Sequence, residues 1–120
     1  MTQTFFISGL LPGANDFMGK KSRWAYTAIK KEWGEAIGLY ILLAKIQPMN
    51  RVSISFTWWE RNRKRDPDNI MVAQKFILDA LVTRQILTND GWNAIASLHH
   101  TFYEDKRHPG VHVVLQSVGD

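Results

Sequence analysis

The hydrophobic pattern between Val52 and Val82 constrains the fold more than any other feature, because its period changes once from that of a strand to that of a helix. The first part alternates, which is typical of a half-buried strand. One face carries Val52, Ile54, Phe56 and Trp58, and the other carries Ser53, Ser55, Thr57 and Trp59. The second part, from about Asp68 to Val82, predicts a helix whose buried arc is Ile70, Ile77, Leu78 and Leu81. A strand followed by such a helix favours a sheet with helices packed on it.

Weaker signals place the other elements on both sides of this segment. A short buried strand is expected over Thr4–Ser8, and a helix after a cap at Ser22, with apolar residues at helical spacing: Ala25, Ile29, Trp33, Ala36, Ile37 and Tyr40. Two further strands are expected near Ala94–Tyr103 and over Val111–Leu115, with a turn at His108–Gly110. The order β-α-β-α-β-β predicts an α+β fold, a single mixed sheet with two packed helices. Because the chain has 120 residues and no linker, we expect residues 1–120 to form one domain.

Positive charge is concentrated in two short stretches. Lys and Arg number 15 against 11 Asp and Glu, a net charge of +4, which favours a polyanionic partner. We expect both stretches to contact a DNA backbone; they are Arg61, Arg63, Lys64 and Arg65, and Lys20 and Lys21.

The absence of cysteine excludes disulfide scaffolds, thiolate zinc sites and cysteine nucleophiles, and it fits a reducing cytoplasm. The longest apolar run, Gly38–Ala44, is far shorter than the roughly 20 residues that span a bilayer. The N-terminus lacks the charged and apolar regions of a signal peptide. We therefore expect a soluble, cytoplasmic protein with no membrane partner.

Three aspartates form the candidate chemistry. Asp66 and Asp68 flank Pro67, which disfavours helix at Asp66 and so places Asp68 at the start of the following helix. Lys75 and Asp79 lie on the same helical face as Asp68, and Asp90 lies in a turn between Asn89 and Gly91. Carboxylates beside phosphate-binding cations are what Mg²⁺, or Mn²⁺ in its place, needs to hydrolyse a phosphodiester.

Each part of this pattern has a plainer interpretation. Asp68 and Asn69 could be helix caps, Lys75 and Asp79 a pair at helical spacing, and the basic stretch a solvated loop. A non-catalytic DNA-binding protein would then be the alternative function. A phosphotransferase or phosphatase with a D-x-D motif is a third hypothesis, but it requires longer parallel βα repeats than this chain can hold.

Histidine and tryptophan give weaker indications. His99 and His100 point to opposite faces of a strand, so we do not expect them to share a metal. Trp24, Trp33 and Trp58 are expected in the core. Trp59 and Trp92, near the charged segments, could stack on unpaired bases, although packing is the default interpretation.

The motifs resemble one known family, the RusA-type Holliday junction resolvases, which are crossover junction endodeoxyribonucleases. The resemblance covers essentially the whole chain, and its motifs are R-D-P-D-N (Arg65–Asn69), K-F-I-L-D-A-L (Lys75–Leu81), N-D-G (Asn89–Gly91) and an N-terminal P-x-x-N loop (Pro12–Asn15).

The resemblance implies a magnesium-dependent endonuclease, bacterial or phage-encoded, that resolves four-way DNA junctions by paired nicks. The family's three aspartates fall on Asp66, Asp68 and Asp90, and its functional lysine falls on Lys75. Arg65 and Asn15 would contact DNA. This chain is a few residues longer between Asn69 and Lys75 than the family pattern, so Lys64 or Arg65 is the alternative to Lys75. The family is homodimeric, and the apolar stretch Leu39–Leu43 is the candidate interface.

Overall fold

A computed structural model describes residues 1–17 and 23–119 of the chain. Four strands and four helices follow one another in this part. They are β1 (Thr2–Ser8), α1 (Ala14–Phe17), α2 (Arg23–Leu43), β2 (Val52–Glu60), α3 (Pro67–Met71), α4 (Gln74–Thr83), β3 (Ile95–Glu104) and β4 (Gly110–Ser117). The expected cap at Ser22 and the cations Lys20 and Lys21 lie outside the described residues.

The strands form one mixed sheet in the order β1-β4-β2-β3. The α3–α4 segment connects β2 to β3, and because a helical crossover returns the chain in the same direction, these two strands are parallel. Strand β4 lies between β1 and β2 and is antiparallel to both. This confirms the predicted α+β fold with a single mixed sheet.

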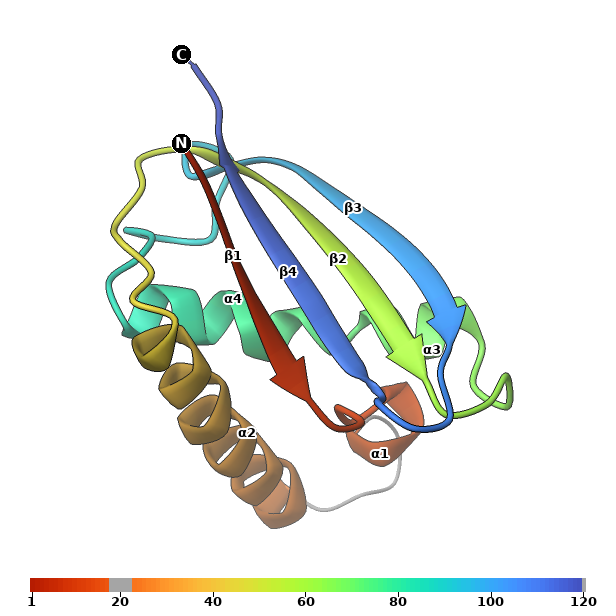
Figure 1. Ribbon diagram of the computed structural model, residues 1–120. Coiled ribbons are helices and arrows are strands. Elements are labelled where there is room, and N and C mark those ends of the chain that lie inside the picture. Colours follow the sequence, from red (N-terminus) through yellow and green to blue (C-terminus); the bar gives the residue numbers. More distant parts are fainter. Residues whose placement is uncertain (18–22, 120) are drawn as a thin grey trace.

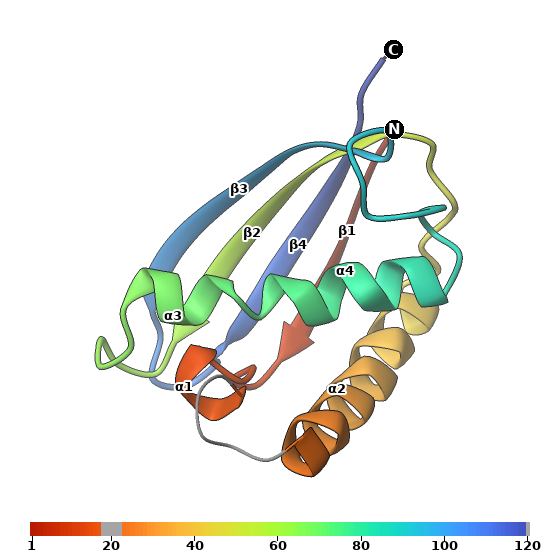
Figure 2. The same cartoon turned by 180° about the vertical axis from the view of Figure 1, so that it is seen from behind.

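Helices α2, α3 and α4 lie on the same face of the sheet, as the opposite views of Figures 1 and 2 show. The core fills the space between them. The predicted inward face of β2 is buried, as is the predicted arc of the second helical segment; its members are Val52, Ile54, Phe56, Trp58, Ile70, Ile77, Leu78 and Leu81. On the face opposite the helices, β2 presents partly or fully exposed side chains. The two hydrophobic periods thus predicted which side of each element would face the core.

The predicted second helix is interrupted, which corrects the expectation of one helix from Asp68 to Val82. Helix α3 ends at Met71 and α4 begins at Gln74. Between them, the amide of Ala73 donates to the carbonyl of Ile70, and the amide of Lys75 donates to the carbonyl of Val72. These bonds span three residues instead of four, so the backbone is wound more tightly between α3 and α4. Helix α4 nevertheless continues in about the direction of α3 (Figure 2). The break falls between Asn69 and Lys75, where the spacing departs from the family pattern.

The expectation for Trp24 is wrong. Its side chain is 86% exposed, because the first turn of α2 projects beyond the end of the sheet (Figure 1). Trp58 is buried and Trp33 packs partly buried against the core, as predicted. Within the described residues, no helix is both long enough and apolar enough to span a membrane.

Candidate active site

The basic stretch forms an exposed loop after the end of β2. Arg61, Arg63 and Lys64 are exposed. Arg63 makes an ion pair with Glu104 at 3.2 Å, but 88% of its side chain is exposed, so solvent screens the pair and it contributes little to stability. These three side chains are therefore available to a polyanion.

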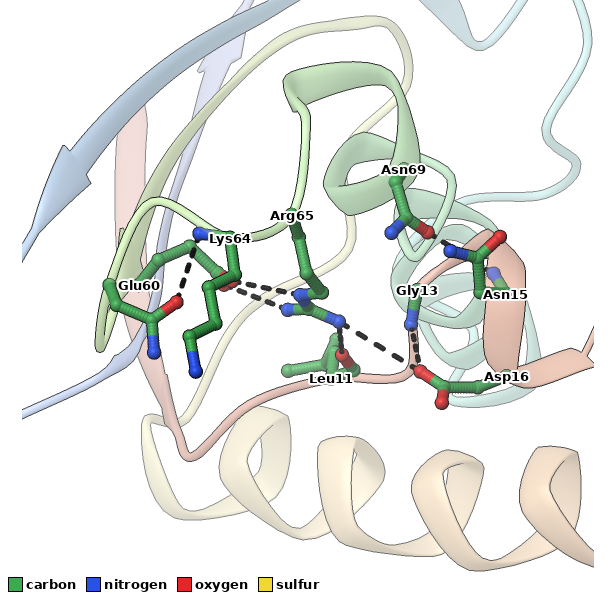
Figure 3. A network of polar contacts seen from close by, with 9 residues as sticks. Leu11, Gly13, Asn15, Asp16, Glu60, Lys64, Arg65 and Asn69 are labelled. Atoms are coloured by element: carbon green, nitrogen blue, oxygen red, sulfur yellow. Dashed lines mark hydrogen bonds and ion pairs between the residues drawn. The ribbon is translucent and has the colours of Figure 1, made fainter.

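Arg65 differs from the rest of the stretch because its guanidinium points into the protein (Figure 3). Its Nε and Nη2 donate to the two carboxylate oxygens of Glu60, each at 2.9 Å. Its Nη1 donates to the carbonyl oxygen of Leu11 at 2.9 Å and lies 3.9 Å from a carboxylate oxygen of Asp16. In this arrangement Arg65 joins the end of β2 to the segment that follows β1.

The N-terminal loop packs directly on the R-D-P-D-N segment (Figure 3). The amide of Asn15 donates to Oδ1 of Asn69 at 3.2 Å. A Cβ atom on Gly13 would lie 2.6 Å from that same oxygen and 2.9 Å from Nη1 of Arg65, so a larger residue here would displace one or both of these side chains. The side chain of Asp16 accepts a bond from the Gly13 amide at 2.7 Å. Hydrogen bonds thus join two motifs that lie more than fifty residues apart in the chain.

Asp66 and Asp68 belong to the R-D-P-D-N segment. Asp66 is the N-cap residue of α3, with φ −72° and ψ 154°, so it ends an extended stretch as predicted. Its backbone carbonyl accepts the amides of Asn69 and Ile70, while its side chain makes no capping bond. The interpretation of Asp68 and Asn69 as caps is therefore wrong. The carboxylates of Asp66 and Asp68 are both exposed and have no partner among the described residues.

Two aspartates, Asp79 and Asp90, lie beside the side chain of Lys75. Its Nζ lies 3.0 Å from Oδ1 of Asp79 and 3.4 Å from Oδ2 of Asp90. The hydrogen bond to Asp79, followed by the negative charges of both aspartates, raises the pKa of Lys75 and keeps it protonated, although partial burial opposes this. The pairing of Lys75 with Asp79 is present, as the plainer interpretation predicted. The contact of Lys75 with Asp90 brings together two of the expected site residues.

The chemistry of these donors fits a hard divalent cation. Mg²⁺ is held by one or two carboxylates together with water and substrate phosphate, and exposed oxygens of this kind are present on Asp66, Asp68 and Asp90. In residues 1–17 and 23–119, no three acidic or histidine side chains lie close enough together to hold one ion. For Asp66, Asp68 and Asp90 to share one ion, the Asp90 loop would have to move toward the other two aspartates, or the phosphate of a bound nucleic acid would have to supply a further ligand.

Three contributing residues were not singled out from the sequence. Glu60 had a usable signal, since it continues the alternation of β2 onto the buried face, where a carboxylate needs a partner. Asp16 and Leu11 had none, because their contacts with Arg65 depend on how the segment after β1 folds back.

In comparisons with known proteins, no family model matches this chain, and no curated protein matches it. The resemblance to the RusA-type resolvases therefore rests on the sequence motifs alone and stays a prediction.

Proposed function

We propose that this protein is a divalent-metal-dependent endonuclease that cuts branched DNA. The observation that carries the proposal is the position of Asp66 and Asp68, exposed and without partners among the described residues, directly after a loop with three accessible cations. Neither carboxylate makes a capping bond or an ion pair with a described residue, so this pair of aspartates has no evident role in the fold, and its exposed oxygens are of the kind that a hard divalent cation prefers. Such a pair is favourable where a metal ion is bound.

The loop cations would bind the strand to be cut. Arg61, Arg63 and Lys64 would each neutralise a backbone phosphate and so hold the strand against the aspartates. The ion pair of Arg65 with Glu60 would fix the loop relative to α3, so that the loop cations and the two aspartates keep their relative positions. Carboxylates of Asp66, Asp68 and Asp90, completed by the phosphate of the bound strand or by movement of the Asp90 loop, would hold Mg²⁺ or Mn²⁺, which would supply a water of lowered pKa and stabilise the leaving oxygen. Protonated Lys75 would place a positive charge beside Asp90, close to the negative charge that develops on the phosphate.

The alternative function is a DNA-binding protein without catalysis, in which the aspartates serve the fold. The absence of a side-chain cap at Asp66 favours the nuclease over this alternative, because it removes the structural role that the aspartates would have. The two functions also differ in a measurable way, since a binding protein would be indifferent to Mg²⁺.

The substrate we propose is the four-way junction, and the active form is a homodimer. A junction has two-fold symmetry and needs two nicks, while each chain carries one set of aspartates; closed two-fold assembly is also the commonest form of oligomer. Three leucines of the stretch Leu39–Leu43 are exposed on α2 and fit a contact between copies; they are Leu39, Leu42 and Leu43.

A cleavage assay on an end-labelled four-way junction, with Mg²⁺ or with EDTA, tests the proposal. Wild type should cut only with the metal, and Asp66→Asn, Asp68→Asn and Asp90→Asn should each abolish cutting while still binding the junction. Glu32→Gln on the exposed surface of α2 is the matched control and should cut at the wild-type rate. Metal-independent cutting, or near-normal cutting by all three aspartate variants, would refute the proposal.

A further inference from the structure

Trp92 is the most exposed large hydrophobic side chain in the described part of the protein, at 93%. It lies in the loop between α4 and β3, two residues after Asp90 (the cyan loop in Figure 2). Exposing a side chain of this size to water is unfavourable, because the burial of its apolar surface is lost. Single exposed apolar residues are common, so exposure alone assigns no role.

The turn that carries Trp92 is firmly anchored. The carbonyl of Gly91 accepts the amides of Ala94 and Ile95 at 3.1 and 3.0 Å, and the Gly91 amide donates to Oδ1 of Asn89 at 2.8 Å. Ala94 is buried, and its carbonyl accepts the amide of Val52. A collapsing loop would let Trp92 fold back onto the surface, but these bonds hold its backbone in place. The indole is therefore presented outward by a rigid support.

Trp92 also lines a hollow of about 440 Å³ with mixed chemistry. Arg51 and Asp90 supply charge, and the apolar part comes from Leu78, Ile95 and Leu98. Asp90 in turn contacts Lys75. An aromatic ring, an arginine and an apolar surface thus meet at one place, beside an aspartate of the candidate active site.

We propose that this hollow binds one unpaired nucleotide of the DNA substrate, with its base stacked on Trp92 and its phosphate near Arg51. An indole stacks on any nucleobase through its π face, while arginine neutralises the phosphate that accompanies it. Neither interaction reads the base sequence, so the subsite selects unpaired over paired DNA. This inference rests on the proposed function and adds to it the part of the substrate that lies beside Asp90.

The other tryptophans do not offer this arrangement. Trp59 is already stacked on Tyr103, with ring centroids 4.8 Å apart, and Trp58 is buried. Trp24 is almost as exposed as Trp92, at 86%, but it lies in the first turn of α2, at the opposite end of the molecule from the Asp90 loop (Figures 1 and 2). Trp24 is therefore a matched control for the removal of an exposed indole.

The test compares two single strands of equal length and charge, oligothymidylate and a strand of abasic residues, in EDTA so that no cleavage occurs. Wild type should bind oligothymidylate about tenfold more tightly than the abasic strand, with quenching of its tryptophan fluorescence. Trp92→Ala should bind both strands alike and lose the quenching. Trp92→Phe should keep part of the preference, and Trp24→Ala should behave as wild type.

The inference is overturned if wild type binds the two strands equally, or if Trp92→Ala still prefers the strand with bases. It is also overturned if Trp92→Ala alters the mass of the protein in solution, since Trp92 would then contact a second copy. These outcomes are separate from the proposed function, because cleavage of a junction by wild type and its loss in the aspartate variants do not depend on the strand preference. A protein that cuts normally but shows no preference keeps the function and loses only the subsite.

Discussion

Arg65 and Glu60 form a two-pronged ion pair at the end of β2, with both bonds at 2.9 Å and the Glu60 residue only 8% exposed. The pair contrasts with that of Arg63 and Glu104, which joins the same residue types nearby but is largely exposed. The Arg65–Glu60 pair is thus largely buried, whereas the Arg63–Glu104 pair lies on the surface. This difference leads to the first prediction.

Glu60→Gln should lower the free energy of unfolding by about 1–3 kcal/mol, because the guanidinium of Arg65 would lose its buried counter-charge. Glu104→Gln removes the exposed pair and should change stability by no more than about 0.5 kcal/mol. Urea denaturation of both variants measures the difference. Equal effects would mean that the Arg65 pair does not support the fold.

In EDTA, Asp68→Asn should bind junction DNA more tightly than wild type. Its carboxylate lies among groups that we expect to face phosphate, and repulsion between unit charges a few ångströms apart is worth about 1 kcal/mol in partly screened surroundings. Titration at low salt measures the gain. Binding no tighter than that of wild type would place Asp68 away from the DNA.

Lys64→Ala should have the opposite effect on DNA binding. Loss of one phosphate contact should weaken the affinity and reduce the salt slope, by about 0.9 on a double-logarithmic plot for duplex DNA. The stability of the protein should not change, because the Lys64 side chain makes no hydrogen bond or ion pair with a described residue. A salt series on both proteins tests this, and an unchanged slope would remove Lys64 from the interface.

His100 should make stability depend on pH. Its Nδ1 accepts the indole N–H of Trp58 at 2.9 Å and its Nε2 donates to Oε1 of Gln74 at 3.0 Å, a pattern that requires the neutral ring. Burial, and secondarily the charge of His99, lowers the pKa of His100 below the ordinary histidine value of 6.5. The unfolded chain therefore binds a proton more readily, so stability should fall as pH drops below that ordinary value and stay constant above it.

Urea unfolding at a series of pH values measures this contribution. His100→Gln should lose the part of the pH dependence that lies just below the ordinary histidine pKa, whereas His108→Gln, in an exposed loop, should keep it. An identical profile for His100→Gln and wild type would show that His100 does not titrate in that range.

Two glycines should respond oppositely to replacement by alanine. A Cβ atom on Gly110 would be forced against the carbonyl oxygen of Ile7 in the neighbouring strand, so Gly110→Ala should cost about 1–3 kcal/mol. Gly34 lies inside α2 with nothing within 4 Å of such an atom, so Gly34→Ala should stabilise the protein by about 1 kcal/mol. Thermal unfolding of both variants provides the comparison. Shifts in the same direction would contradict the packing at β4.

Leu42→Glu should convert a dimer into monomers. Leu42 is 59% exposed and lies between Leu39 and Leu43 in the proposed contact, where a carboxylate would be buried without a partner. Lys30→Glu changes charge elsewhere on the exposed surface of α2 and should leave the mass unchanged. Light scattering at micromolar concentration measures both. A monomeric wild type, with or without junction DNA, would contradict the proposed assembly.

The sequence by itself determined the fold class and which faces are buried. The alternation of β2 and the arc of Ile70, Ile77 and Leu81 are local patterns, because side-chain direction along a strand or a helix follows from backbone geometry alone. It also determined that Asp66 ends an extended stretch, since Pro67 restricts the residue before it. These features needed no knowledge of distant parts of the chain.

Only the tertiary structure decided how the candidate site is assembled. Arg65 stands in a run of cations, and nothing local distinguishes it from Lys64; it turns inward because Glu60 and the Leu11 carbonyl meet there. Trp24 and Trp58 are chemically the same, yet Trp24 is exposed in the first turn of α2, whereas Trp58 is buried on the face of β2 that the helices cover. The contact of Lys75 with Asp90 likewise depends on the loop after α4 folding back. Such contacts join residues far apart in the chain, and their free energy depends on the burial that the whole fold provides.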